Sequence, residues 1–537
     1  MADAKAARRA GGRSAKQRKR QAPVARSQRP VQPGQLGGRY QPLTNANVER
    51  VHETALTVLE TVGLANSIPS CAALVQSAGG GISKEGRLLF PRKLVQEALR
   101  RANRNTVLHG RVAEHDLQLA GTRLYFGTAG AAVHVAEAGD KEYRESTLAD
   151  IYDAARLVDV LDNIHFFQRP MVARDMPTDL ELDVNTLYAC LAGTGKHVGT
   201  SFVTDDTLRA CLPLVHALAG GEQAWRARPF VSISCCFVVP PLRFAQDACG
   251  VLEAGVAAGF PILLLSAGQA GATSPAALAG SVVQEVAEVL AGLTYVNLLR
   301  PGHPAIFGTW PFVSDLRTGA MSGGSGEQAV LAAACAQMGR YYDLPTGIAA
   351  GMADAKLPDV QSGYEKAYTD ALAAHSGANL VYEAAGMQAS LLGCSLESLV
   401  VDNDMLGAIN RTVRGIEVND STLSLQTIKD VCVDGPSHYL GDAQTLSMMH
   451  SEYLYPEVGD RTSPKEWYEQ DKPDVMLKAS ARLRRIMAEH FPAHIDAAVD
   501  ARLRAELPIR LPPETMRAST SPWTVNKTVA GPESDVA

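Results

Sequence analysis

Charged and aromatic residues follow several short apolar runs in the second half of the chain. The charged ones are Asp354, Lys356, Glu383, Asp402 and Asp404, and the aromatic ones are Trp310 and Phe312. Carboxylates beside aromatic faces suit a cation, above all a quaternary ammonium ion, which cannot donate hydrogen bonds. Each residue taken alone is equally compatible with helix capping or core packing. Together they predict a binding site for a methylated ammonium ion rather than for an anion.

Glycines also lie in the loops after the apolar runs. Glycine lets the backbone approach a bound molecule closely. Four of them are therefore expected where a bound molecule approaches: Gly268, Gly271, Gly351 and Gly386.

A turn-rich segment, residues 435–441, contains His438 and Tyr439. A carboxylate on the substrate would need a cationic or hydrogen-bonding partner. Lys356, Arg317 and His438 are the candidates for that role.

Several well-known active-site motifs do not occur in the sequence. There is no HExxH pair, no Cys/His cluster with zinc spacing, no GxSxG elbow and no GxxxxGK[ST] phosphate loop. No metal site is predicted.

A regular series of apolar runs positions these residues. The runs begin near Asn163, Lys196, Phe230, Phe260, Pro304, Thr346, Asn379 and Ser398. Near-continuous apolar runs are typical of parallel strands that are covered on both faces, and helical patterns fill most of the gaps. Eight such units over roughly 250 residues predict an α/β fold, a (β/α)₈ barrel over 161–435. An open doubly wound sheet is the alternative, although no GxGxxG follows the first run.

The segments that flank the predicted barrel differ from it in composition. Residues 1–40 carry eleven Lys/Arg and one Asp, which predicts a disordered basic tail. We expect an N-terminal α+β elaboration over 41–160, with a capping box at Thr147 and Asp150. A helical C-terminal extension is expected over 436–511, followed by a tail over 512–537.

Composition excludes several classes of protein. The chain is 46% hydrophobic with a net charge of −6, and residues 41–537 carry 40 basic and 56 acidic groups, so we expect no nucleic-acid binding. The most apolar stretch, residues 260–272, is too short to span a bilayer, so no membrane association is expected. Nine cysteines without a CxxC pair indicate a reducing cytoplasm.

Four segments resemble the trimethylamine methyltransferase family: residues 274–292, 301–329, 351–366 and 435–461. The resemblance extends from about Leu43 to Leu511. It implies a (β/α)₈ barrel that moves a methyl group from a methylamine or a quaternary amine to the Co(I) of a separate corrinoid protein. Archaeal trimethylamine enzymes of this family carry pyrrolysine within or near the third segment. Here that segment holds standard residues only, which implies the branch that acts on betaines such as glycine betaine.

The resemblance also implies roles for the candidate residues. Asp354, Lys356, Gln361 and Glu383 lie near the family's special residue and are expected to be catalytic. The expected substrate-binding residues are Trp310, Phe312, Asp402, Asp404, His438 and Tyr439. The resemblance also implies that the partner's corrinoid approaches Gly268, Gly271, Gly351 and Gly386. No cofactor is expected to be bound permanently, because the corrinoid is carried by a separate protein and the DxHxxG motif of cobalamin-carrying domains is missing here. We expect a homo-oligomer. The competing hypotheses are a non-catalytic binding protein for betaines and a barrel lyase or decarboxylase that acts on a cationic amine.

Overall fold

The computed structural model describes residues 28–137, 142–433 and 435–525. The chain forms two compact units. Of the described residues, one unit comprises 33–137, 142–413 and 456–525, and the other comprises 28–32, 414–433 and 435–455.

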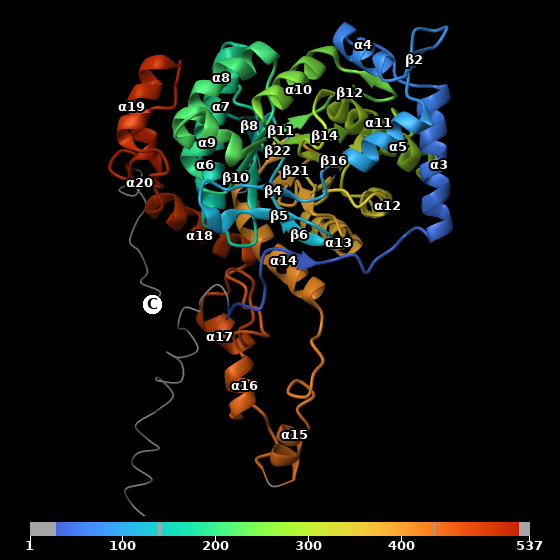
Figure 1. The fold of residues 1–537 in the computed structure, drawn as a ribbon. Coiled ribbons are helices and arrows are strands. Elements are labelled where there is room, and N and C mark those ends of the chain that lie inside the picture. Colours follow the sequence, from blue (N-terminus) through green and yellow to red (C-terminus); the bar gives the residue numbers. More distant parts are fainter. Residues whose placement is uncertain (1–27, 138–141, 434, 526–537) are drawn as a thin grey trace, which may run out of the picture. The chain divides into compact units, whose positions relative to one another are not determined.

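Eight parallel strands form a closed barrel in the larger unit (Figure 1). They are β6 (Arg123–Phe126), β9 (Phe166–Gln168), β10 (His197–Thr200), β11 (Val231–Cys235), β14 (Ile262–Ser266), β16 (Ala305–Thr309), β19 (Thr346–Ala349) and β20 (Leu380–Tyr382). From β9 onwards each strand pairs in parallel with the next, and β20 pairs with β6. A parallel bridge between Gly127 and Phe166 closes the ring between β6 and β9.

A helix follows every barrel strand and covers its outer face. These helices are α6 (Leu148–Asp159), α7 (Asp179–Gly193), α8 (Asp205–Ala219) with α9 (Glu222–Ala227), α10 (Gln246–Ala258), α11 (Leu278–Leu299), α12 (Gly326–Tyr341), α13 (Val360–Ser376) and α14 (Leu396–Arg414). Because helices cover one face and the barrel interior the other, the strands are apolar on both faces. The predicted (β/α)₈ barrel is confirmed.

Seven of the eight predicted runs are barrel strands, but the predicted series begins one strand too late: it omits β6 and adds a run that is not a strand. The run from Ser398 is not a strand but the first turn of α14, whose buried residues Leu399, Leu406 and Val413 recur at helical spacing. A short apolar run cannot by itself distinguish a strand from a buried helix. The first barrel strand is β6, which lies within the predicted elaboration, so the predicted boundary at residue 161 falls inside the barrel.

The N-terminal elaboration packs on the outside of the barrel. Its elements are β1 (Gln35–Leu36), α3 (Asn45–Thr61), α4 (Pro69–Ser77), β2 (Gly81–Ile82), β3 (Leu88–Leu89), α5 (Arg92–Arg101), β4 (Thr106–Leu108) and β5 (Leu117–Leu119). Helices α3, α4 and α5 contact α11, which packs on β14 and β16 with its other side. Among the described residues, α11 is the one helix long and apolar enough to cross a membrane, and 83% of its apolar window is buried inside the protein. Burial between two layers explains its composition.

Loops at the C-terminal ends of the strands pair with one another. Strands β7 (His134–Glu137) and β8 (Glu142–Glu145) share a sheet with β21 (Met387–Gln388) and β22 (Gly393–Cys394). Strand β15 (Gln269–Ala270) pairs with β17 (Phe312–Ser314), which pairs with β18 (Met321–Ser322). A hairpin of β12 (Val238–Val239) and β13 (Arg243–Phe244) follows β11. Hydrogen-bonded pairing between these loops therefore gives the rim of the barrel mouth regular structure.

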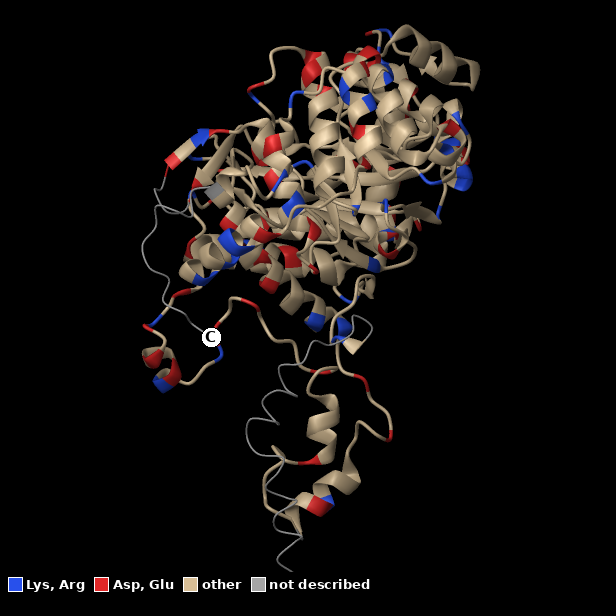
Figure 2. Cartoon of the chain, turned by 90° about the vertical axis from the view of Figure 1, so that its left-hand side faces the viewer, with Lys and Arg blue, Asp and Glu red and all other residues tan. Residues whose placement is uncertain are grey.

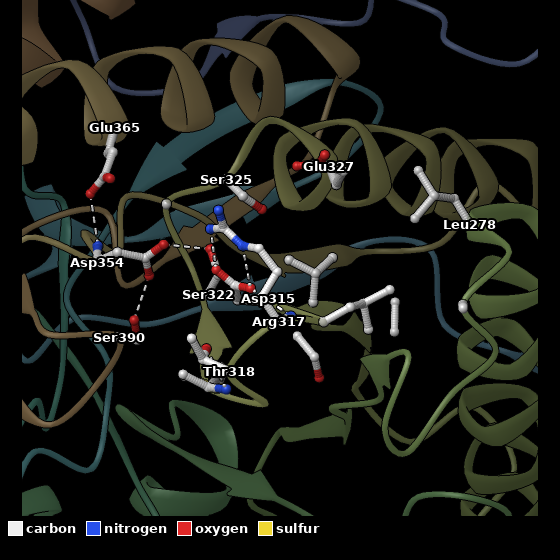
Figure 3. A pocket seen from close by; sticks show the side chains of 18 of the residues that line it. Leu278, Asp315, Arg317, Thr318, Ser322, Ser325, Glu327, Asp354, Glu365 and Ser390 are labelled. Atoms are coloured by element: carbon white, nitrogen blue, oxygen red, sulfur yellow. Dashed lines mark hydrogen bonds and ion pairs between the residues drawn. The ribbon is translucent and has the colours of Figure 1, made fainter.

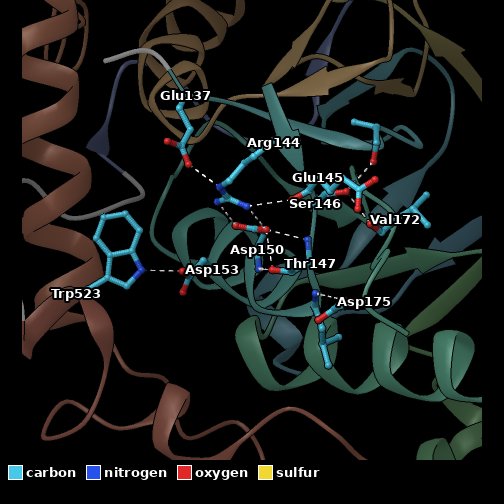
Figure 4. A network of polar contacts seen from close by, with 12 residues as sticks. Glu137, Arg144, Glu145, Ser146, Thr147, Asp150, Asp153, Val172, Asp175 and Trp523 are labelled. Atoms are coloured by element: carbon cyan, nitrogen blue, oxygen red, sulfur yellow. Dashed lines mark hydrogen bonds and ion pairs between the residues drawn. The ribbon is translucent and has the colours of Figure 1, made fainter. Parts of the chain in front are cut away.

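A polar network holds the start of α6 (Figure 4). Thr147 and Asp150 form the predicted capping box. The Arg144 guanidinium donates two hydrogen bonds to Asp150, at 2.7 and 2.8 Å, and also contacts Glu137. Trp523 donates from Nε1 to Asp153 at 2.7 Å, so the C-terminal segment is anchored to the same helix.

Short helices complete the C-terminal part. Helices α15 (Leu425–Cys432) and α16 (Ala443–Met448) belong to the smaller unit, and α17 (Pro464–Glu469), α18 (Val475–Glu489), α19 (Ala497–Glu506) and α20 (Pro522–Val525) belong to the larger one. Lys, Arg, Asp and Glu lie interspersed on the helices that surround the barrel (Figure 2). The predicted basic tail falls mostly outside the described residues.

Candidate functional site

A cavity of about 200 Å³ lies at the C-terminal ends of the barrel strands. Its lining comes from the ends of seven barrel strands or from the loops that follow them: Gly130 and Ala131, Gln168 and Arg169, Thr200 and Ser201, Ser234 and Cys236, Leu265 and Ala267, Trp310 and Phe312, Glu383 and Leu391. In barrel enzymes the active site lies at this end of the strands. We call this space the mouth cavity.

Glu383 is the acidic residue of the mouth cavity. It directly follows β20, its side chain is 1% exposed, and Oε2 has no hydrogen-bond partner among the described residues. Its φ of 63° lies in the left-handed region, where a residue other than glycine costs about 1–3 kcal/mol. Burial raises the pKa of Glu383 to about 8. A strained backbone that holds an unpaired buried carboxyl group is typical of functional sites.

Aromatic side chains form one wall of the mouth cavity. Trp310 follows β16 and is 5% exposed, and Phe312 begins β17. The Trp310 ring lies 5.2 Å from the Tyr382 ring, centroid to centroid, and Tyr382 packs edge-on against Phe166. The cavity therefore combines a carboxyl group with aromatic faces, which is the combination that suits a methylated ammonium ion.

Arg169 brings a positive charge to the same cavity. It follows β9, and its guanidinium donates to the Ser201 hydroxyl at 2.8 Å and to the Met171 carbonyl at 3.2 Å. Burial lowers the pKa of Arg169 from its ordinary value. Arg169 is not among the site residues predicted from the sequence. The sequence nevertheless contained a signal for this position, because Arg169 lies next to the end of a predicted strand, as Ser201 and Cys236 do.

A pH dependence of cation binding follows from the Glu383 carboxyl group. A group with a pKa of about 8 is mostly protonated at pH 6, and a bound cation favours its ionised form. Because binding must then release a proton, we expect the affinity for tetramethylammonium to fall about tenfold per pH unit below pH 8. Calorimetric titration of the full chain between pH 6 and 8.5 measures this. Glu383→Gln should abolish the slope, and a flat profile for the unaltered protein would contradict the role of Glu383.

A second cavity, of about 670 Å³, contains the two predicted residues Asp354 and Lys356 (Figure 3). The Asp354 carboxylate accepts hydrogen bonds from the hydroxyls of Ser322 and Ser390 and from the Gly323 amide at 2.9 Å. It thereby joins the loops that follow β16, β19 and β20. Lys356 is exposed, and its Nζ donates to the Asp354 carbonyl at 2.5 Å. These contacts indicate that Asp354 organises the loops.

Gln361 lies in the first turn of α13 and is exposed. Its amide donates to Glu365 at 2.8 Å, and Glu365 in turn accepts a hydrogen bond from the Asp354 amide at 2.7 Å. The structure thus places Asp354, Lys356 and Gln361 together, but it does not place them in the lining of the mouth cavity with Glu383.

A paired substitution distinguishes loop organisation from catalysis. Asp354→Ala removes three hydrogen bonds to a carboxylate, and we expect it to destabilise the protein by about 2–4 kcal/mol. Lys356→Ala removes one exposed contact and should leave both activity and melting temperature nearly unchanged. Thermal melts and a methyl-transfer assay on both variants measure this. A large loss of activity in Asp354→Ala at unchanged melting temperature would show that the carboxylate acts in catalysis.

Asp402 and Asp404 lie on helix α14 and not at a strand end, so the strand-based reason for choosing them is wrong. Asp402 is buried and forms an ion pair with Lys366, with Nζ and Oδ2 2.6 Å apart. Asp404 accepts backbone hydrogen bonds from Glu457, Val458 and Gly459 at 2.8–3.0 Å. Both carboxylates thus already have ion-pair or hydrogen-bond partners within the protein.

The four predicted glycines are required by close contacts within the protein. A Cβ on Gly268 would come within 2.6 Å of Glu285 Oε1, and one on Gly351 within 2.6 Å of Asp370 Oδ2. Gly271, Gly351 and Gly386 have φ angles of 88°, 77° and 89°. These constraints account for glycine at each position without a ligand. Their predicted proximity to a cofactor stays a prediction.

His438 and Tyr439 belong to the smaller unit. Tyr439 is 40% exposed, and its hydroxyl lies 3.4 Å from the Cys432 sulfur. Their predicted role in substrate binding stays a prediction.

The residues from 28 to 137, 142 to 433 and 435 to 525 include no group of three or more His, Cys, Asp or Glu side chains placed to hold a metal ion.

Comparisons with known proteins show similarity to methyltransferases over most of the chain. The family model described as trimethylamine methyltransferase matches residues 9–510. The chain is 30% identical over 467 residues to the trimethylamine methyltransferase of Methanosarcina thermophila, covering 86% of this chain and 96% of the relative. It is 28% identical over 473 residues to a glycine betaine methyltransferase of Desulfitobacterium hafniense, covering 88% of this chain and 97% of the relative. The crystal structure of the Methanosarcina barkeri monomethylamine methyltransferase aligns with a TM-score of 0.45 at 12% identity, covering 84% of this chain and 96% of that structure.

Proposed function

The chain belongs to the trimethylamine methyltransferase family, and we propose that it transfers a methyl group from a quaternary or tertiary methylammonium compound to the Co(I) of a separate corrinoid protein. The observation that carries this proposal is the mouth cavity, where the buried, unpaired Glu383 carboxyl group lies in one lining with Trp310 and Phe312. This arrangement suits a cation, because it puts aromatic faces beside a buried carboxyl group.

The residues of the mouth cavity bind and orient the methyl donor. The ionised Glu383 carboxylate attracts the ammonium charge, and the aromatic faces contact its methyl groups. A quaternary ammonium leaves as a neutral tertiary amine, so the protein need not supply a proton. The corrinoid supplies the Co(I) nucleophile that accepts the methyl group. Once the donor has lost its charge, its attraction to Glu383 is lost, and this favours release of the product.

The size of the mouth cavity supports a separate acceptor protein. A volume of about 200 Å³ corresponds to roughly seven water molecules. Such a space fits a small methylated amine. A corrinoid presented from outside, on a partner protein that docks at the barrel mouth, agrees with this size.

Methyl transfer to free cob(I)alamin tests the proposal, because the free corrinoid replaces the partner protein as methyl acceptor. Purified full-length protein is incubated with glycine betaine, carnitine, choline or trimethylamine, and the demethylated amine is measured by mass spectrometry. We expect product for at least one donor, and only when cob(I)alamin is present. Binding without demethylation in the presence of either free or protein-bound corrinoid would favour a betaine-binding protein. Carbon–carbon or carbon–nitrogen cleavage products without corrinoid would favour a lyase or decarboxylase.

A further inference from the structure

We propose that Glu285 and Glu288 of α11 are positioning residues: they fix the segment that follows β14, and this segment fixes the backbone of the two aromatic residues in the wall of the mouth cavity. This inference rests on the proposed function and goes beyond it. Neither carboxyl group lines the cavity, and neither is among the site residues predicted from the sequence. Both act through residues between them and the cavity.

The first contact joins Glu285 to the loop after β14. Glu285 Oε1 accepts a hydrogen bond from the Gly268 amide at 2.5 Å. The Gly268 carbonyl accepts one from the Phe312 amide at 2.9 Å, and Gly268 directly follows Ala267, which lines the mouth cavity. Glu285 Oε2 has no hydrogen-bond partner in the described part of the chain, so this link depends on Oε1.

The second contact joins Glu288 to the end of the strand itself. Ser266 is the last residue of β14, and its hydroxyl donates to Glu288 Oε2 at 2.5 Å. The Ser266 carbonyl accepts a hydrogen bond from the Trp310 amide at 2.8 Å. Glu288 Oε1 also accepts from the Leu242 amide, at 2.6 Å. The two carboxyl groups thus hold both residues of the β14 end that receive the backbone of the aromatic wall.

Burying two neighbouring carboxyl groups is unfavourable for stability. Both side chains are fully buried, and removing a carboxyl group from water costs free energy that apolar packing avoids. Burial and the neighbouring Glu288 raise the pKa of Glu285 well above its usual value, so the pair does not carry two negative charges. The gain that offsets this cost is the order that the pair gives to the loop at the barrel mouth.

This order matters because the aromatic faces contact the cation. The Trp310 ring lies 5.2 Å from the Tyr382 ring, centroid to centroid, and its position depends on the backbone contact to Ser266. Without the Glu285 carboxyl group, the Gly268 amide is a donor without an acceptor, and the loop must move to satisfy it. A misplacement of about 1 Å in a binding site can cost about 100-fold in rate.

Two substitutions on one helix separate positioning from stability. Glu285→Leu removes the acceptor of the Gly268 amide at the barrel mouth. Asn297→Leu is the matched control, because Asn297 is a buried residue of α11 whose Oδ1 accepts from the Gly302 amide at 3.1 Å, just before β16 and at the opposite end of the barrel. We expect both variants to melt at a lower temperature. Only Glu285→Leu should weaken tetramethylammonium binding, by at least about tenfold in calorimetric titration of the full-length protein.

A conservative variant tests which atom is responsible. Glu285→Gln keeps the size of the side chain and an acceptor oxygen for the Gly268 amide, so it should bind tetramethylammonium within about threefold of the unaltered protein. Thermal melts verify that each variant is folded. If Glu285→Leu does not fold, Ser266→Ala replaces it: this change removes the hydroxyl that reaches Glu288, and we expect it to weaken binding at least about threefold.

The outcomes distinguish this inference from the proposed function. If Glu285→Leu binds tetramethylammonium as tightly as Asn297→Leu does, or if Glu285→Gln binds as weakly as Glu285→Leu, the positioning role is overturned and the proposed function stands. In the absence of a folded Glu285→Leu, normal binding by Ser266→Ala overturns it equally. If tetramethylammonium does not bind the unaltered protein, the cation site and the positioning role both fail.

Discussion

Replacing Glu383 by Gln is expected to slow methyl transfer at least about 100-fold without lowering the melting temperature. The substitution keeps the size of the side chain but removes the charge that holds the ammonium ion. At a buried carboxyl group such as that of Glu383, loss of one partner of an ion pair costs about 3–5 kcal/mol, which corresponds to a factor of 100 or more. The assay is single-turnover methyl transfer from glycine betaine to cob(I)alamin.

The stability of Glu383→Gln provides the internal control. Burial raises the pKa of Glu383 to about 8, above its unfolded value near 4.5, so the folded protein loses stability as pH rises from 4.5 towards 8. The variant lacks this penalty and should therefore melt at the same or a higher temperature, with the largest gain above pH 8. Glu327→Gln, in the second cavity, makes the same chemical change and should leave the rate unaffected. A rate within tenfold of normal for Glu383→Gln would remove Glu383 from the site.

Replacing Lys366 by Met is expected to destabilise the protein by about 3–5 kcal/mol. The Lys366 ammonium is fully buried and contacts Asp402 at 2.6 Å and the Ser398 hydroxyl at 2.7 Å. Without it, the Asp402 carboxylate is a buried charge with no counterion. Burial raises the pKa of the neighbouring Asp370 well above its usual value, and a carboxyl group cannot replace the lost positive charge.

The same substitution is expected to disturb the mouth cavity. Asp402 also accepts a hydrogen bond from the Gly386 amide at 2.8 Å, three residues after Glu383. Urea unfolding and the methyl-transfer rate are measured for Lys366→Met and for the double variant Lys366→Met/Asp402→Asn. The double variant should recover much of the stability, because it removes both charges together. If the single variant loses less than about 1 kcal/mol, the ion pair does not hold this part of the barrel.

Local pattern was sufficient to predict the barrel and three of the residues that line the mouth cavity. Apolar runs followed by helical periodicity predicted β9 to β20, and Thr147 with Asp150 predicted the start of α6. The rule that barrel sites lie after the strands led to Trp310, Phe312 and Glu383, which the structure brings together in the mouth cavity. These features depend on residues near one another in the chain, and their signal is therefore present in the sequence.

Tertiary structure decided which charged residues share a cavity and which are used by the protein itself. Asp354, Asp402 and Asp404 looked equivalent to Glu383 in the sequence, but each accepts hydrogen bonds from distant segments, and Glu383 Oε2 does not. Arg169 looked like an ordinary loop arginine until closure of the barrel placed it in one lining with Glu383, 214 positions later in the chain. The barrel closes between β6 and β9, so β6 is its first strand, and the last apolar run forms part of a helix. A carboxylate's partner and a strand's neighbour are set by contacts between residues far apart in sequence, whereas periodicity and capping depend on residues only a few positions apart.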